Sequence, residues 1–502
     1  MTEPACWRAP LACYPGFNRF VLAWLDGRAN EFLPRVVDAP PRRTDRRIGS
    51  ELANTLIESN ERWGFSVREE VERWARGETY TIVAGQQVGF AGGPLYTLAK
   101  IASLIRMKRD SEAAGVPATA LFWLATEDHD FAEVATLSLP SRGKQQLDLK
   151  HLKATRGFDS RAAVGPLPIP ESLIAEFLAF YEMPRPSWLR EGITFRDSFA
   201  ELLAVAVREG IVLVDALLPE LRRAGAPLFE QLVAKSDALQ DDIRRRSLAL
   251  DAAGYSPQIV SRDGEPYTLL FRLDADGNRQ PFDGTAANPE TISTSALTRP
   301  LLQDFVLQPD VFVGGPAEVA YYAQIAGLHE LLGVTLPRIA LRGHALVVPK
   351  RVGRLFTRFD IAPVEAFSNP DEILIDREPH GVAAVRDVAH EAHRELDAAI
   401  EKIRELALPA DHALARSINR SIGHINYHFD KLTERATRGL VRKDRERYAA
   451  MKELVATLYP DQHAQDRVTG WIAYWCEYGE LLVERLIDEI SPDTAEFRIV
   501  SL

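Results

Sequence analysis

The sequence predicts an α/β protein with a doubly wound parallel core, inserts between its core elements, and a C-terminal α-helical coiled-coil domain. Three observations carry this prediction. Short apolar, β-branched runs end in glycine or polar loops, as buried parallel strands do. Segments with helical spacing follow these runs, and the last quarter of the chain carries sustained heptads.

The composition limits the classes of protein to which this chain can belong. The 502 residues suffice for two or three compact units, and 46% hydrophobic with 26% charged residues is ordinary for a globular chain. The net charge of -11 argues against general affinity for nucleic acid or anionic membranes. No apolar stretch of membrane-spanning length and no secretion signal stand out. We therefore expect a cytoplasmic protein with neither nucleic acid nor membrane as partner.

The first half of the chain contains one βαβ unit. Residues 1–75 predict a segment of helix and loop packed on the core, with helices at 17–25 and 49–74. The run YTIVAG (80–85) predicts a buried strand, residues 96–109 have helical spacing, and ATALFWLA (118–125) predicts a second strand. Such a unit places a ligand-binding loop after each strand.

Later segments extend the core and divide the chain. IVLVD (211–215), DVFVGG (310–315) and ALVVP (345–349) predict further core strands, residues 226–250 a helix, and 272–284 a polar hairpin. The predicted domains are then an N-terminal segment 1–75, the first half of the core with an insert 76–225, a helix and hairpin insert 226–292, the second half of the core 293–370, and a helical coiled-coil domain 371–502.

Two heptad seams mark the coiled coil. Apolar residues alternate four and three apart from Val385 to Leu406, and again from Ile418 to Ala436. Pro409 and Asp411 lie between them, so an antiparallel helical hairpin is expected. The helix at 226–250 could join this arm. A helical arm favours a homodimer.

The first candidate site is the loop GQQVGFAGGPLYTLAK (85–100). Its glycines allow the backbone to approach a ligand closely, and the following helix offers free N–H groups to an anion. It matches no established nucleotide motif. The alternative is a tight turn with Lys100 on the solvated surface. The candidate ligand-binding residues are Gly85, Gln86, Gln87, Gly92, Gly93, Tyr96 and Lys100.

The second candidate is TEDHDFAEV (126–134), which places Glu127, Asp128, His129 and Asp130 where a βα loop enters the ligand crevice. A carboxylate could orient the imidazole as a general base or an amine-binding group. A charged surface loop is one alternative, and a divalent metal held by Asp128, His129 and Asp130 is another.

The third candidate is VFVGGPAEVAYYAQ (311–324), where a strand again ends in GGP. Its helix carries polar side chains, and this loop could face the first across one crevice. The candidates are Gly314, Gly315, Glu318, Tyr321, Tyr322 and Gln324.

Four further basic side chains suit recognition of a carboxylate or phosphate, or surface salt bridges: Arg299, Arg338, Arg342 and His344. The three cysteines, Cys6, Cys13 and Cys476, exclude a disulfide framework.

Together the segments GQQVGFAGGPLYTLAK, FWLATEDHDFAEV and STSALTRPLLQDFVLQPDVFVGGPAEVAYYAQI resemble the cysteine-adding enzymes of bacillithiol biosynthesis, also called cysteine ligases. The resemblance covers most of the chain. It implies a Rossmann-like core and a coiled-coil domain that mediates dimerisation. It also implies ligation of cysteine to glucosaminyl malate.

Amide formation of this kind implies ATP as co-substrate, which Mg²⁺ could accompany. Lys100, Asp128, His129 and Asp130 are then the expected catalytic residues, with no dedicated metal site. Glu127, Arg299 and the residues of the first and third loops would bind substrate. Two other classes stay open: a metal-dependent hydrolase that uses Asp128, His129 and Asp130, and a non-catalytic coiled-coil interaction protein.

Overall fold

The computed structural model describes residues 6–38, 42–129, 134, 138–140, 146–148, 162–208, 210–261, 265–275, 277–282, 284, 288–377, 379–407 and 412–502. The chain divides into two compact units. Unit 1 comprises Met1–Val347 and His463–Leu502, and unit 2 comprises Val348–Gln462. The chain therefore leaves unit 1, builds unit 2 and returns to complete unit 1.

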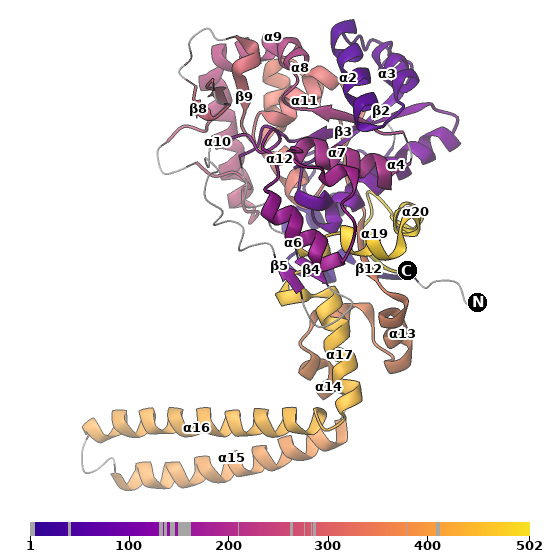
Figure 1. Ribbon diagram of the computed structural model, residues 1–502. Coiled ribbons are helices and arrows are strands. Elements are labelled where there is room, and N and C mark those ends of the chain that lie inside the picture. Colours follow the sequence, from indigo (N-terminus) through magenta and orange to yellow (C-terminus); the bar gives the residue numbers. More distant parts are fainter. Residues whose placement is uncertain are drawn as a thin grey trace. The chain divides into compact units, whose positions relative to one another are not determined.

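A five-stranded parallel sheet, ordered β11-β10-β2-β3-β6, forms the centre of unit 1 (Figure 1). Its strands are β2 (Tyr80–Gln86), β3 (Ala118–Leu124), β6 (Val212–Asp215), β10 (Val311–Gly314) and β11 (Arg338–Leu341). The chain runs outward from β2 through β3 to β6, and then from β10 to β11 on the other side of β2. Strand order thus reverses between β2 and β10, which makes this edge the expected ligand crevice.

One predicted core strand belongs to a different sheet. Residues 345–349 were expected in the parallel core, but β12 (His344–Val348) joins β13 (Glu496–Ser501) and β1 (Cys6–Pro10) in a three-stranded sheet. The fifth place in the core is taken by β11, which pairs with β10 from Val311↔Arg338 onward. Both runs are short and apolar, so local pattern does not tell which sheet each one joins.

Helices connect the core strands. α4 (Leu95–Ala113) links β2 to β3 and contacts both, and α12 (Pro316–Leu332) links β10 to β11. Further helices of unit 1 are α1 (Arg19–Leu25), α2 (Ser50–Trp63), α3 (Arg68–Ala75), α6 (Glu171–Tyr181), α7 (Phe195–Ala206), α8 (Pro219–Ala224), α9 (Ala226–Ala234), α10 (Ser236–Ala252), α11 (Arg299–Leu307), α18 (Gln465–Val468), α19 (Ile472–Tyr478) and α20 (Glu480–Glu489).

Two long helices expected from the sequence are each divided. The segment 49–74 forms α2 and α3, because Gly64 adopts φ 102° and ends α2. The segment 226–250 forms α9 and α10, which meet at Lys235, and α10 packs against α12 within unit 1. The expectation that this helix joins the coiled-coil arm was therefore wrong.

The predicted hairpin at 272–284 is confirmed. β7 (Leu270–Leu273) pairs antiparallel with β8 (Arg279–Pro281), and β9 (Ile292–Thr294) pairs with the other edge of β7. A second small pair joins β4 (Ser138–Pro140) to β5 (Gln146–Asp148).

Unit 2 is helical and carries the predicted hairpin. Its helices are α13 (Lys350–Phe359), α14 (Pro370–Arg377), α15 (Pro379–Ala407), α16 (His412–Val441) and α17 (Arg445–Leu458). α15 and α16 pack side by side along their length (Figure 1), as the heptad seams predicted. Pro409 and Asp411 lie outside the described residues.

The predicted fold class, a doubly wound parallel core with a helical coiled-coil domain, is confirmed. No helix among the described residues has the length and apolarity needed to cross a membrane.

Candidate active site

A cavity of about 1010 Å³ opens where β2, β3 and β10 end. Gly85 and Gln86 come from the end of β2, Ala125 follows β3, and Gly315 follows β10. The cavity therefore lies at the carboxyl edge of the sheet, at the reversal of strand order. The sequence-predicted site residues that line it are Gly85, Gln86, Gln87, Tyr96, Lys100, Glu127, Asp128, His129, Arg299, Gly315, Glu318 and Tyr321.

Lys100 is buried inside this cavity wall and does not lie on the solvated surface. Its Nζ forms an ion pair with Glu318 and donates hydrogen bonds of 2.8 Å to Gly85 O and to Gln86 Oε1. These three acceptors use all the donors of an ammonium group. Burial lowers the pKa of Lys100, although the neighbouring Glu318 carboxylate opposes that effect. Lys100 thus joins the first loop to the third.

Arg299 and Tyr321 extend this charged cluster. The Arg299 guanidinium lies 3.9 Å from Glu318 Oε1 and donates a hydrogen bond to the Tyr321 hydroxyl. Burial raises the pKa of Tyr321, more than the nearby guanidinium lowers it, so the phenol stays protonated at neutral pH. Arg299 stays cationic: burial would lower its pKa, but Tyr321 and Glu318 raise it above the ordinary value.

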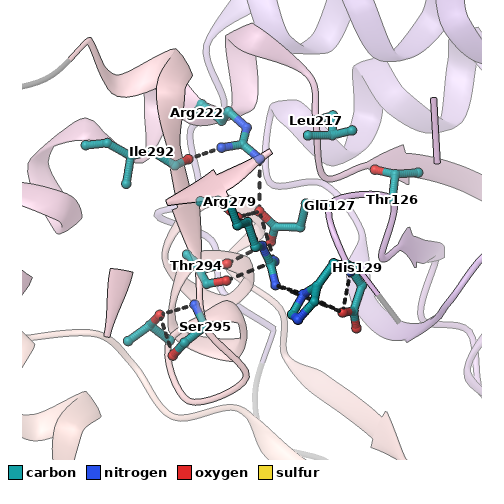
Figure 2. Close-up of polar contacts among 12 residues, drawn as sticks. Thr126, Glu127, His129, Leu217, Arg222, Arg279, Ile292, Thr294 and Ser295 are labelled. Atoms are coloured by element: carbon teal, nitrogen blue, oxygen red, sulfur yellow. Dashed lines mark hydrogen bonds and ion pairs between the residues drawn. The ribbon is translucent and has the colours of Figure 1, made fainter. Parts of the chain in front are cut away.

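Glu127 is fully committed to contacts within the protein (Figure 2). Its carboxylate pairs with Arg222 at 2.9 Å and accepts hydrogen bonds from Ser293 and Thr294 of β9. Burial alone would raise its pKa, but the guanidinium groups of Arg222 and then Arg279 hold the pKa of Glu127 below its usual range. Glu127 therefore fastens the loop after β3 to the β9 strand.

His129 contacts an arginine that the sequence did not single out (Figure 2). The NH1 group of Arg279 lies 3.0 Å from His129 Nδ1, whereas Asp128 Oδ1 lies 3.6 Å from the same atom. Because the shorter contact requires Nδ1 to accept, we assign a neutral ring with its proton on Nε2. In this arrangement His129 offers a hydrogen-bond donor to the cavity.

Asp128 is a half-exposed carboxylate of the cavity, with 35% of its side chain accessible. It accepts hydrogen bonds of 2.7 Å from Gln87 Nε2 and from its neighbour's backbone N–H, on different oxygens. Each carboxylate oxygen can accept a further bond. Asp128 is therefore placed to receive an amine or a proton from a ligand. Asp130 lies outside the described residues.

Two glycines of the first loop do not line the cavity. Gly92 adopts φ 86°, and a Cβ there would lie 2.4 Å from the indole of Trp471, whose Nε1 donates to Gly92 O at 2.9 Å. Gly93 adopts φ 75° and packs near Thr97. Gly92 thus approaches a tryptophan closely, where the sequence had suggested a ligand.

Three residues of the third loop lie behind the cavity wall. Gly314 packs on Phe312, with no room for a Cβ. Tyr322 donates to Asp304, which also contacts His329 at 3.0 Å in a buried cluster. Gln324 accepts from the backbone N–H groups of residues 258 and 259 and donates to the carbonyl of 259. Gln324 therefore holds in place a segment whose residues 259–261 line the cavity.

Sequence reasoning missed several lining residues. Arg279 lies on the hairpin strand β8, and Arg467 lies on α18, about 370 residues after Lys100 in the chain. The polar hairpin itself was the signal for Arg279, because an insert between core strands can fold over the crevice. No local pattern pointed to Arg467.

The cavity differs in charge from the whole chain. Among the described residues, five basic side chains and four acidic ones line it, against a net charge of -11 for the protein. None of the three cysteines lines it, and each is a free thiol. Within the described ranges no three His, Cys, Asp or Glu side chains gather as metal ligands would.

Two family models match almost the whole chain. Residues 27–286 and 282–343 match "Bacillithiol biosynthesis BshC, N-terminal Rossmann-like domain", and residues 345–502 match the C-terminal coiled-coil domain of the same family. The chain is 30% identical over 478 residues to a protein of Koribacter versatilis, and 28% identical over 452 residues to one of Solibacter usitatus, covering 87% and 86% of each chain. It is 24% identical over 501 residues to one of Bacillus licheniformis, covering 92% of both. Each of these relatives is named "Putative cysteine ligase BshC".

Proposed function

Since this chain belongs to the BshC family of bacillithiol biosynthesis, we propose that it is a ligase that joins cysteine to glucosaminyl malate by ATP-dependent amide bond formation. The observation that carries the proposal is the single cavity that unites three loops from β2, β3 and β10. It presents cations, a half-exposed carboxylate and a neutral hydrogen-bond donor around one space. Amide formation between a carboxylate and an amine needs all three.

Cysteine would first be activated. Its carboxylate oxygen attacks either the α-phosphorus of ATP, releasing pyrophosphate, or the γ-phosphorus, releasing ADP. The acceptor amine then attacks the acyl carbon, the C–O bond to AMP or phosphate breaks, and the amine gives up a proton. The cationic side chains Arg299 and Arg342 in the cavity wall suit the phosphates and the developing oxyanion.

Asp128 is the proposed site for the acceptor amine and the first recipient of its proton. Its carboxylate is half exposed and retains unused acceptor positions, whereas both oxygens of Glu127 are engaged by protein donors. His129, with its proton assigned to Nε2, would donate to the acyl oxygen. Lys100 would act by holding Glu318 and the first loop in position.

The observations favour this class over the hydrolase alternative. The Arg279 guanidinium lies 3.0 Å from His129 and 4.0 Å from Asp128, so a cation already occupies the surroundings of both groups. A divalent metal bound to the same pair would be repelled by it. Mg²⁺ would accompany ATP as part of the nucleotide substrate.

The direct test is a reconstitution. Purified protein is incubated with cysteine, glucosaminyl malate and ATP, and products are followed by mass spectrometry. The expected result is a cysteinyl amide formed only when all three are present, with AMP or ADP identifying the activated intermediate. Asp128→Asn should reduce the rate by about 100-fold or more. The matched control Asp241→Asn, at an exposed aspartate of α10, should not. Nucleotide hydrolysis without amide would refute the proposal.

We also propose that unit 2 forms a homodimer contact through α15 and α16. Large apolar side chains on these two helices stay exposed within the chain, among them Val388 at 68% and Leu432 at 63%. A second copy of the same hairpin would cover them.

A further inference from the structure

A second, smaller cavity lies beside the candidate active site. Its volume is about 230 Å³. Pro316, Ala317, Arg342 and Arg467 line both cavities, so the two share a wall. The far side of the small cavity is formed by residues 14–18, which lead into α1, and by His344 at the start of β12. We refer to it as the side pocket.

His344 is an unpartnered polar group in the lining of the side pocket. Only 2% of it is exposed, and neither ring nitrogen has a hydrogen-bond partner in the described part of the chain. Its ring packs edge-on against Tyr14 and Phe17, with centroids 5.9 Å and 5.1 Å away. Burial, and then the nearby guanidinium of Arg342, holds its pKa well below the ordinary value, so the ring is neutral. Buried polar groups without partners are rare, and they commonly mark a place where something else binds.

The charges around the side pocket leave one cation in excess. Asp466 accepts from the Tyr14 hydroxyl on one oxygen and from Arg342 at 2.9 Å on the other, so that acid and Arg342 compensate each other. Arg467 is exposed and has no ion pair or hydrogen bond with any described residue. The pocket thus offers one uncompensated guanidinium and one neutral imidazole.

We propose that the side pocket is an anchoring subsite for a compact carboxylate on the acceptor substrate, held by Arg467 and His344. This inference rests on the proposed function and names the part of the site that selects the acceptor. A single excess positive charge matches a carboxylate better than a doubly charged phosphate. At about 30 Å³ per water molecule, the volume corresponds to roughly eight waters, which suits a small organic acid group.

The two cavities lie next to each other, because Pro316, Ala317, Arg342 and Arg467 line both. Pro316 and Ala317 begin α12, immediately after Gly315, which lines the main cavity beside Lys100. In our proposal, a substrate with its carboxylate in the side pocket extends its amine past Ala317 toward the main cavity. The side pocket would fix the acceptor, and cysteine and ATP would not enter it.

The test compares two substitutions with a matched control. Arg467→Gln removes the unpaired cation, and His344→Phe keeps the ring packing but removes both nitrogens. Arg8→Gln is the control, because Arg8 is an exposed arginine of unit 1 that lines neither cavity. Binding of malate, inorganic phosphate and glycerol is measured by titration calorimetry on the full chain, with melting temperatures to monitor folding.

Malate affinity should fall about ten-fold or more in Arg467→Gln and in His344→Phe, and should stay unchanged in Arg8→Gln. His344→Phe should melt at or above the temperature of the parent protein, because it removes a buried polar group that has no partner. Unchanged malate binding in both substituted proteins would overturn the proposal. Tighter binding of phosphate than of malate, with the same dependence on Arg467, would also overturn it.

Ligase assays separate this proposal from the function on which it rests. The KM for glucosaminyl malate should rise in Arg467→Gln while the KM for cysteine stays close to that of the parent. If the protein is an active ligase and Arg467→Gln has the same KM for glucosaminyl malate as the parent, the subsite is refuted but the proposed function is not. If malate binding depends on Arg467 and His344 but the protein forms no amide, the subsite is supported and the proposed function is refuted.

Discussion

Replacing Lys100 with methionine should destabilise unit 1 through the partner that Lys100 leaves behind. The ammonium contacts the Glu318 carboxylate, and only 4% and 15% of the two side chains are exposed. Removing one member of a buried ion pair costs about 3–5 kcal/mol of the free energy of unfolding, since the other charge stays buried without its partner. In Lys100→Met, Glu318 still accepts the hydrogen bond from the Gly315 N–H and still lies 3.9 Å from Arg299. We therefore expect a loss of unfolding free energy near the lower end of this range.

The double variant Lys100→Met, Glu318→Gln isolates this cause. Glutamine still accepts the Gly315 N–H but carries no charge to leave unpaired. Neutralising both members of a buried pair is often close to neutral, so the double variant should unfold within about 1 kcal/mol of the parent. Its ligase activity should stay low, because the first and third loops lose the group that joins them.

Urea unfolding of the parent and both variants, with ligase rates on the same preparations, measures the two effects. A loss below about 1 kcal/mol in Lys100→Met would mean that water or Arg299 already compensates Glu318. Recovery of activity together with stability in the double variant would show that Lys100 has no role beyond neutralising Glu318. Either result would refute the reasoning given for this residue.

Burial lowers the pKa of Lys100 below its ordinary 10.5, so the unfolded chain binds more protons near that pH; the stability of the parent relative to Lys100→Met should therefore increase from pH 8 toward 10.5 in urea titrations. Gly92→Ala should lower the free energy of unfolding by roughly 1–2 kcal/mol because of its φ of 86°, and by about 1–3 kcal/mol more because its Cβ would collide with Trp471. Gly115→Ala, with φ 80° and open space around it, should show only the first of these two losses in urea unfolding. Equal losses in the two variants would contradict the packing argument. Arg279→Lys should reduce kcat/KM by about ten-fold, because a lysine cannot reach His129, Ser293 and Thr294 together; an unaltered kcat/KM would exclude a role for Arg279 in positioning His129. Val388→Glu with Leu432→Glu should convert a dimer to a monomer in light scattering, and the exposed control Arg8→Gln should not.

Strands and helices with strong local patterns could be predicted from the sequence. YTIVAG and ATALFWLA are short, apolar and bounded by loops, and they form β2 and β3 almost to the residue. The heptads after Val385 predicted α15 and α16, because a repeat of seven residues fits a helix and does not fit the two-residue repeat of a strand. The meeting of the first and third loops followed from parallel strands that share one carboxyl edge.

Features that depend on distant pairing could not be predicted. RIAL and HALVV look alike locally, but one joins the core and the other pairs beside β13. The C-terminal residues after 463 read as more helix of the coiled-coil domain, although FRIV is a β-branched run that forms part of β13. Because that return to unit 1 was not foreseen, neither Trp471 against Gly92 nor Arg467 in the cavity wall could be found.

The pairing of β13 with β1 has a consequence for the order in which the protein matures. At about 5–20 residues per second, the ribosome completes the strands of the parallel sheet well before it releases Arg467, Trp471 and the residues of β13. A chain that stops after unit 2 would possess the sheet but would lack the Asp466 that neutralises Arg342 and the indole that packs on Gly92. Truncated or stalled products therefore cannot present a complete cavity. Binding competence becomes a property of the finished polypeptide alone.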